Sequence, residues 1–366
     1  MSSTTATPTA NKPQANAYAA GKLPKNSSLY VLLASWVVSG AVFLVLQLSG
    51  ATSGFNIVGT IFFGTVLYCV AIYALSYFVE GVRKAKDRLV TALVTAAFVI
   101  ALLPLISLIF TTVVNGLPGI LTPTFFTESQ RNVVGAGGGA LHAIVGTLLI
   151  TGVATLISVP IGLLAAIYLT EYGRGRLARA ITFFVDVMTG IPSIVAGLFA
   201  FAFFALIFND PGIRFGFGGA IALSVLMIPV VVRSSEEMLK LVPNELREAA
   251  YALGVPKWLT ILKVVLPTSL AGIVTGIMIS ISRVIGETAP LLIISGFTAS
   301  MNYDLFNERM MTLPVFVYTQ YANQGTDTQA YLDRAWAGAL TLVLIVMLLN
   351  GVARLIAKYF SPKLGR

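Results

Sequence analysis

An arginine and a glutamate lie four residues apart inside a strongly apolar stretch of the chain. Arg283 and Glu287 have the spacing that places two side chains on one face of a helix, within reach of an ion pair. A charge at the centre of a membrane-spanning helix costs about 2.5–3.5 kcal/mol on insertion scales, so it needs a reason. The hydroxyls of Ser282 and Thr288 lie nearby, and a partly neutralised cation among hydroxyls is suited to an oxyanion in transit. The alternative is a structural ion pair that holds two helices together.

A second polar interruption lies earlier in the chain, at Asp186, Gly190, Pro192 and Ser193. Pro192 leaves the carbonyl of Met188 without its helical donor, and discontinuous helices line substrate paths in transporters. The pattern therefore predicts a pathway role for Asp186, Pro192 and Ser193. A simple interfacial position is the alternative for Asp186, which lies close to the end of its apolar block.

The stretch 236–267 is polar and carries helix signals of its own. Pro243 suits a first helical turn, alanines favour a helix, and Gly254 suits the left-handed position that ends one. A short helix of small residues at a membrane surface suits insertion into a groove of another protein. An ordinary amphipathic surface helix is the alternative.

Helices in a membrane must position all of these residues. The chain is 57% hydrophobic and 11% charged, whereas soluble domains carry roughly 25% charged residues. Its apolar blocks are long enough to cross a hydrocarbon layer about 30 Å thick. The sequence therefore predicts an all-α integral membrane protein with eight transmembrane helices, at 29–49, 55–79, 89–114, 141–169, 181–208, 215–232, 267–296 and 335–357.

The net charge of +9 reports orientation rather than nucleic-acid binding. When the chain is threaded through the membrane from a cytoplasmic N-terminus, 19 of its 24 basic residues fall inside. This asymmetry predicts a multi-pass protein of the cytoplasmic membrane, surrounded by lipid, with both termini in the cytoplasm. The basic residues that fall outside are Arg131, Arg214, Arg309 and Arg334.

The organisation along the chain is uneven. Residues 1–28 are predicted to be a disordered cytoplasmic tail, because they contain little to pack. Residues 29–79 form an accessory transmembrane hairpin, and 89–361 form the main body. The outer loop 297–334 either docks an extracytoplasmic partner or caps the bundle.

Chemistry performed by the chain itself is not expected. No G-x-x-x-x-G-K-[ST] sequence is present, so a nucleotide site is not predicted and any ATP must be used by another subunit. Cys69 and His142 are each alone in their residue type, so neither a disulfide nor a metal site is predicted. We predict no catalytic residues and no cofactor in this chain.

One pattern in the polar stretch is specific. Glu248-Ala249-Ala250, three residues, Gly254, nine residues, Val264, one residue and then Leu266-Pro267 resembles the EAA loop of ATP-binding-cassette importer permeases. That family usually has Ile at the position of Val264. The resemblance implies that Glu248, Ala249, Ala250, Gly254 and Pro267 belong to coupling helices that dock on a cytoplasmic ATPase.

The phrase Arg283-x-x-Gly286-Glu287-Thr288-Ala289-Pro290-Leu291-Leu292 resembles the PstA-type phosphate permease family. The segment around Pro192 and Ser193 is similar to the same family. The resemblance covers about residues 89–361 and is densest from 141 to 357. It implies a six-span permease core of the type I importer kind, and the hairpin at 29–79 lies outside that pattern.

The resemblance also implies a function and its partners. The chain would pair with a homologous second permease subunit, two ATPase subunits that bind ATP and Mg, and an extracytoplasmic phosphate-binding protein. It would pass inorganic phosphate by alternating access. The alternatives are a permease for sulfate, molybdate or phosphonate, a secondary transporter with Asp186, Arg283 and Glu287 as a relay, and a membrane scaffold or phosphate sensor that transports nothing.

Overall fold

The computed structural model describes residues 23–24, 26–49 and 56–360, with side chains as far as residue 356. The predicted disordered tail therefore lies almost entirely outside the described residues. Every regular element in the described part of the chain is a helix. The chain divides into two compact units, Met1–Leu108 and Ile109–Arg366, with the boundary inside helix α3 (Val82–Ile120).

The first unit contains α1 (Ser27–Leu48), α2 (Ile57–Glu80) and the beginning of α3. The two helices of this hairpin approach closely at Gly64, where an added Cβ atom would lie 3.1 Å from the Cα atom of Trp36. The indole of Trp36 also donates a hydrogen bond to Thr65 Oγ1 at 3.3 Å. Small residues and interhelical hydrogen bonds are the usual means of pairing apolar helices in lipid.

A buried carboxylate ties this hairpin to α3. Glu80 accepts hydrogen bonds from Arg88 at 2.6 and 3.0 Å, from Ser76 Oγ at 2.9 Å and from the backbone N–H of Leu23 at 3.1 Å. The basic run at 83–88 lies within the first turns of α3 rather than in a loop between spans. Because both Glu80 oxygens are satisfied, the charge can remain buried.

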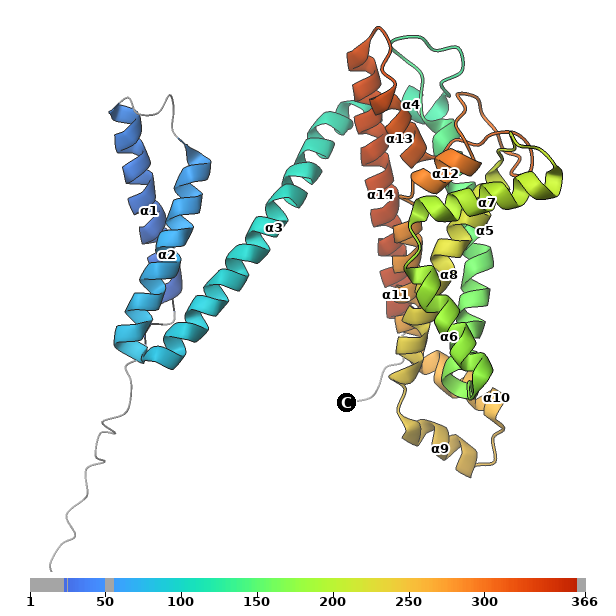
Figure 1. Cartoon of the computed structure of the whole chain (residues 1–366), viewed down its shortest axis with the longest axis horizontal. Coiled ribbons are helices and arrows are strands. Elements are labelled where there is room, and N and C mark those ends of the chain that lie inside the picture. The colour runs from blue at the N-terminus through green and yellow to red at the C-terminus, as the bar shows by residue number, and fades with distance from the viewer. Residues whose placement is uncertain (1–22, 25, 50–55, 361–366) are drawn as a thin grey trace, which may run out of the picture. The chain divides into compact units, whose positions relative to one another are not determined.

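The second unit contains the end of α3 and the remaining helices (Figure 1). These are α4 (Thr124–Thr127), α5 (Leu141–Ile167), the π-helical segment η1 (Tyr168–Tyr172), α6 (Arg176–Thr189), α7 (Ser193–Phe208), α8 (Gly216–Lys240), α9 (Asn244–Ala252), α10 (Lys257–Thr260), the π-helical segment η2 (Ile261–Val265), α11 (Leu266–Val284), α12 (Ala289–Ile294), α13 (Leu313–Ala322) and α14 (Thr328–Phe360).

Helix α8 forms the centre of this unit. Two thirds (67%) of the residues in its most apolar window are buried, against 28% for α5 with η1 and 17% for α14. Leu223 and Met227 of α8 belong to the main core cluster, together with Ile150 of α5, Leu291 of α12 and Phe316 of α13. The other long helices therefore expose apolar surface on their outer sides, as expected of helices that face lipid or another subunit.

Seven described helices are long and apolar enough to cross a membrane, and the pair α6 and α7 makes an eighth crossing if it is one broken span. The predicted fifth span, 181–208, is not a continuous helix, because α6 and α7 are bent by 109° at the break that includes Pro192. Within the second unit, α9 and α10 lie at one end and α4 and α13 at the other (Figure 1).

The predicted seventh span, 267–296, also differs. Its helix is continuous from Lys257 to Val284 and is followed by the separate short helix α12. Pro267 lies inside this helix, two residues after the end of the π-helical turn η2. A π turn shifts the hydrogen-bond register, which lets the helix accommodate a residue that has no backbone donor.

Candidate functional site

The last turn of α11 presents Arg283 on an exposed surface. The helix ends at Val284, and the N–H of Glu287 donates to the Val284 carbonyl at 3.1 Å. Glu287 therefore lies in the break before α12 and not one helical turn further along α11. Among the described residues, Arg283 forms no ion pair and no side-chain hydrogen bond, so the predicted pair with Glu287 is wrong. The i to i+4 spacing brings two side chains together only in a helix that continues.

Pro290 explains where the break falls. It occupies the second position of α12, where the absent N–H has no helical partner to lose. The sequence predicted a kink in one helix at this proline, whereas the structure ends one helix and begins another. The break leaves Gly286 with open space around it, since a Cβ atom added there would meet nothing within 4 Å.

The two predicted hydroxyl neighbours of Arg283 have different environments. Ser282 Oγ accepts a hydrogen bond from Asn350 Nδ2 at 3.1 Å, which ties α11 to α14. Thr288 lies in the break, half-buried like Glu287. Thr288 and Glu287 are thus the polar side chains that share the interruption that follows Arg283.

The two interrupted segments of the sequence meet in the fold. Gly197 of α7 lies against Pro290 of α12, so closely that an added Cβ atom would be 2.5 Å from the Pro290 Cα atom. Gly218 of α8 lies against Ile294 of α12 in the same way, because a Cβ atom added at Gly218 would be 2.6 Å from Ile294 Cγ1. Pro192 precedes the first turn of α7 and is exposed, and Ser193 begins that helix and is half-buried. Glycine at these contacts lets the backbones approach and holds α12 in place.

Asp186 has a partner that the sequence did not suggest. Its carboxylate forms an ion pair with Arg233 of α8, and Arg233 also contacts Glu236 at 3.1 Å. Glu236 in turn pairs with Lys240 at 2.7 Å. The Arg233, Glu236 and Lys240 side chains follow helical spacing, which was the available signal for this cluster. The structure therefore separates Asp186 from Arg283 and gives it an interhelical contact.

A groove of about 430 Å³ runs between α8 and α11. Ser234, Glu237 and Met238 line it from α8, and Gly272, Thr275, Gly276 and Ile279 line it from α11. On α11, Gly276 lies four residues after Gly272, and Arg283 lies seven residues after Gly276 and four after Ile279. These spacings place the four residues on one face of the helix. The lining of the groove thus extends along α11 as far as Ile279, one helical turn before Arg283.

The predicted coupling helix is α9, which contains Glu248, Ala249 and Ala250. It ends in two bonds that satisfy its last carbonyls, from Val255 N to Ala250 O at 3.1 Å and from Gly254 N to Tyr251 O at 2.9 Å. Gly254 has a φ of +76° with no atom within 4 Å of an added Cβ. Glycine is therefore favoured here by its backbone conformation and not by a lack of space.

Arg247 fixes α9 to the rest of the unit. Its guanidinium group donates to Glu171 Oε1 of η1 at 2.9 and 3.1 Å, and to the carbonyls of Val242 and Leu239 at 2.6 and 3.0 Å. The Glu171 side chain is only 5% exposed. Lys257 adds a hydrogen bond to the backbone carbonyl of Glu171. No sequence pattern pointed to Glu171, which lies 76 residues from Arg247 in the chain.

The outer surface of this loop is apolar for an exposed segment. Ala250 faces inward and is buried, whereas Glu248 and Ala249 are exposed. Large apolar side chains surround them in the solvent-exposed part of the loop: Leu246, Tyr251, Leu253 and Trp258, of which Leu253 is 84% exposed. Pro267 is exposed and lies further along, in the first turn of α11. Exposed apolar side chains gathered around a short rigid helix are characteristic of a contact surface.

The described residues contain no group of three or more His, Cys, Asp or Glu that could hold a metal ion. Three features of the second unit are suited to transport: the unpaired Arg283 at an interrupted helix, a groove that ends one helical turn before it, and the helix α9 with exposed apolar side chains around it.

Comparisons with known proteins place the chain in a family. Residues 158–366, more than half of the chain, match the family described as binding-protein-dependent transport system inner membrane component. The chain is 45% identical to phosphate transport system permease protein PstA 1 of Mycobacterium tuberculosis (strain CDC 1551 / Oshkosh), over 75% of this chain and 89% of the relative. It is 41% identical to phosphate transport system permease protein PstA of Yersinia pestis, over 75% of this chain and 90% of the relative.

Two solved structures share the fold. The first is an inward-facing conformation of the MetNI methionine ABC transporter, with a TM-score of 0.50 and 22% identity over 61% of this chain and 96% of that chain. The second is a bacterial ABC transporter involved in the import of the acidic polysaccharide alginate, with a TM-score of 0.53 and 13% identity over 76% of this chain and 97% of that chain. The chain belongs to the family of binding-protein-dependent transport system inner membrane components.

Proposed function

We propose that this protein is the permease subunit of an ATP-driven importer of inorganic phosphate. The observation that carries the proposal is the exposed Arg283, which has no partner among the described residues of a chain whose relatives are named phosphate transport system permeases. A guanidinium group forms paired hydrogen bonds with the oxygens of a phosphate ion. Because no carboxylate neutralises Arg283, its charge remains available to an anion.

The path that we propose follows the groove between α8 and α11. Thr275 and Ile279 line it beside two glycines, so few side chains fill the groove on the face of α11 that carries Arg283. Glu237 lies at the α9 end of the groove and repels anions. An attractive cation followed by a repulsive carboxylate favours transient binding, which transport requires because a tightly held ion does not leave.

Energy would come from partner subunits. We propose that two ATPase subunits, which bind ATP and Mg, dock on the exposed side of α9 around Glu248, Ala249 and Gly254. The bonds from Arg247 to Glu171 support this role, because a helix that transmits force must not move independently of the helices it drives. The α9 end would face the cytoplasm, as would both termini.

The remaining partners complete the transport cycle. A homologous second permease would line the pathway opposite this chain, and an extracytoplasmic phosphate-binding protein would deliver the substrate. Binding and hydrolysis of ATP would then move the two permeases between outward-open and inward-open states. Asp186, Pro192 and Ser193 remain predicted pathway residues, with Asp186 held at the interface of α6 and α8.

The test is uptake of labelled phosphate at low micromolar concentration, with labelled sulfate as the control. Strains would lack this gene and the other phosphate importers, and would carry either no copy or the wild-type gene. We expect phosphate uptake alone to be lost and to be restored by the wild type. Loss of sulfate uptake instead, or persistence of phosphate uptake in the deletion strain, would contradict the phosphate assignment.

A second measurement separates this proposal from a secondary transporter. ATP depletion at a maintained membrane potential should stop uptake, whereas collapse of the potential with ATP maintained should leave it largely intact. The opposite pattern would favour an ion-coupled relay through Arg283 and Glu287. A deletion that changes phosphate-responsive expression but not uptake would favour a sensor.

A further inference from the structure

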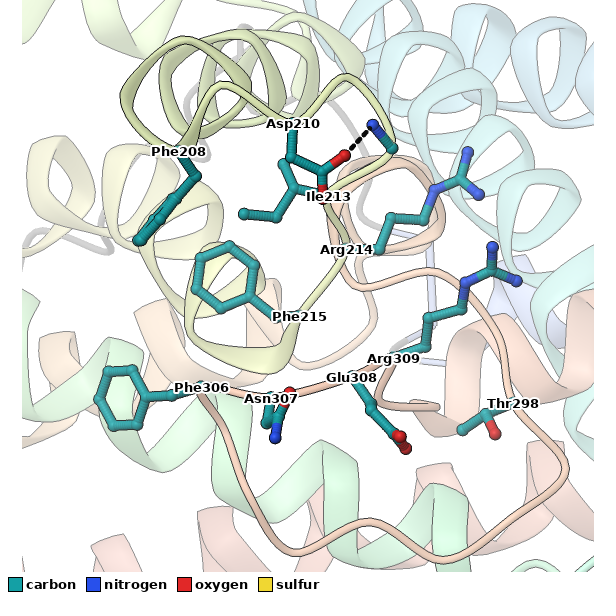
Figure 2. Close-up of a pocket in the computed structure, with 11 residues that line it drawn as sticks. Phe208, Asp210, Ile213, Arg214, Phe215, Thr298, Phe306, Asn307, Glu308 and Arg309 are labelled. Carbon is teal, nitrogen blue, oxygen red and sulfur yellow. Dashed lines mark hydrogen bonds between the residues drawn. The ribbon is translucent and has the colours of Figure 1, made fainter.

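A pair of cations lies at the end of the second unit opposite α9. Arg214 belongs to the loop between α7 and α8, and Arg309 to the loop between α12 and α13. Both line a pocket of about 590 Å³ (Figure 2). The pathway proposed above uses neither residue, and both were predicted to lie on the extracytoplasmic side.

A glycine holds these two arginines together. Gly296 has a φ of +71°, and a Cβ atom added there would lie 3.0 Å from Arg214 Cδ and 3.3 Å from Arg309 Cδ. The two aliphatic stems therefore share the space over one residue without a side chain. Arg214 Nε also donates to the carbonyl of Ile293 at 3.2 Å, which fixes its direction. Figure 2 shows the two guanidinium groups extended to the same side of the pocket.

Neither guanidinium group has a carboxylate partner among the described residues. Asp210, which lines the same pocket, accepts the backbone N–H of Gly212 at 2.8 Å. In Figure 2 the carboxylates of Asp210 and Glu308 lie apart from both arginine heads. Two like charges held side by side repel each other, so an anionic group that reaches both is favoured over one that reaches either alone.

The surroundings of the pair indicate what kind of anion this is. Phe208 and Phe306 line the pocket and are 58% and 70% exposed, and Tyr303 in the same loop is 70% exposed. A small free ion gains little from such rings and is weakly held by guanidinium groups in water. Arginine beside exposed aromatic side chains is instead the composition of protein–protein contact sites.

We propose that Arg214 and Arg309 form a clamp for a carboxylate side chain of the extracytoplasmic binding protein, and that Phe208, Tyr303 and Phe306 form the apolar part of the same docking surface. The inference rests on the proposed function, from which the partner is taken. The clamp carries two positive charges and has aromatic side chains beside it. We therefore expect the binding protein to present an acidic side chain with apolar neighbours.

The experiment uses the whole importer complex reconstituted in lipid nanodiscs and the purified, phosphate-loaded binding protein. Docking affinity would be measured by biolayer interferometry for the wild type, the double variant Arg214→Gln/Arg309→Gln and the control Arg131→Gln. Arg131 is another exposed arginine predicted outside, and it does not line the pocket. We expect the double variant to dock about tenfold more weakly or worse, with a shallower dependence of Kd on salt, and the control to match the wild type.

The yield of complex and its ATPase activity without binding protein report folding of the variants. If the glutamine variant fails to assemble, Arg214→Lys/Arg309→Lys replaces it, and loss of the forked geometry should still weaken docking. Docking of the variant equal to wild type would overturn the clamp. Equal docking together with lost uptake at saturating binding protein would instead assign the pair to the free oxyanion. A wild-type complex that does not dock the binding protein would contradict the proposed function itself.

Discussion

Arg247 and Arg283 lie in the same unit, yet their surroundings are opposite. Arg247 donates to a buried carboxylate and to two backbone carbonyls, and its side chain is only 13% exposed. Arg283 is exposed and has neither an ion pair nor a side-chain hydrogen bond within the described part of the chain. Each cation has a cost in an apolar protein, and only one of them is compensated by the chain itself.

The difference separates the two tasks of a transport subunit. A cation whose donors are all occupied fixes a helix in position but cannot attract a further anion. A cation left open at the end of a helix can attract one, and the broken backbone beside it supplies polar groups that an intact helix would bond internally. Variants of Arg283 should therefore lose anion transport while the complex stays assembled, and variants of Arg247 should lose the docked ATPase subunits.

Arg283→Ala should have the largest effect. Phosphate uptake should fall to the level of the deletion strain, because the only group proposed to attract the anion is removed, while the ATPase subunits still co-purify with the complex. Arg283→Lys should retain part of the uptake, about tenfold below the wild type, since it keeps the charge and loses the forked geometry. A complex that falls apart in the alanine variant would instead assign Arg283 a structural role, in a contact with another subunit.

Arg247→Ala should have the reverse profile. Removing one partner of a buried pair costs about 3–5 kcal/mol, because Glu171 is left buried and uncompensated. We expect α9 to lose its position, which limited proteolysis of the membrane-embedded complex would detect, and the ATPase subunits to be lost on purification. The double variant Glu171→Gln/Arg247→Met should be milder, since neither charge is left behind. If it is as severe as Arg247→Ala, the pair is not what positions α9.

Substitutions at Gly254 sharpen the role of α9. The left-handed conformation costs a residue with a side chain about 1–2 kcal/mol, but an added Cβ meets no atom within 4 Å. Gly254→Ala should therefore weaken co-purification of the ATPase subunits only slightly. Aspartate tolerates this backbone conformation better than alanine, but Gly254→Asp places a negative charge on the proposed docking surface. Glu248→Lys places a positive charge there instead of a negative one. Both should prevent co-purification, and an alanine variant as defective as the aspartate variant would assign the loss to the backbone.

Asp186→Asn should have the smallest effect. The pair with Arg233 is 57% exposed on the aspartate side, and exposed ion pairs contribute about 0.2–1 kcal/mol. Arg233 would also retain Glu236. We expect uptake within about twofold of the wild type and normal complex yield. Abolished uptake with an intact complex would show that the pathway needs the negative charge of Asp186 itself.

Much of the architecture follows from local features of the sequence. Apolar blocks of membrane-crossing length predict helices wherever they occur, because a backbone in lipid must satisfy its own hydrogen bonds. The helix stop at Gly254 is equally local, since it depends on the conformational freedom of one residue. The spacing of Glu248, Gly254 and Pro267 likewise carries the resemblance to the coupling loop of importer permeases, and docking of an ATPase at this loop stays a prediction.

The partners of the charged residues were decided by tertiary structure. The sequence paired Arg283 with Glu287, but that pairing assumed a helix that continues, and α11 ends at Val284 where α12 is held against α7 and α8. Asp186 and Arg233 are 47 residues apart, and Glu171 and Arg247 are 76 apart. Spacing within a helix cannot predict contacts between helices, because these depend on how the small residues at each crossing let the backbones approach.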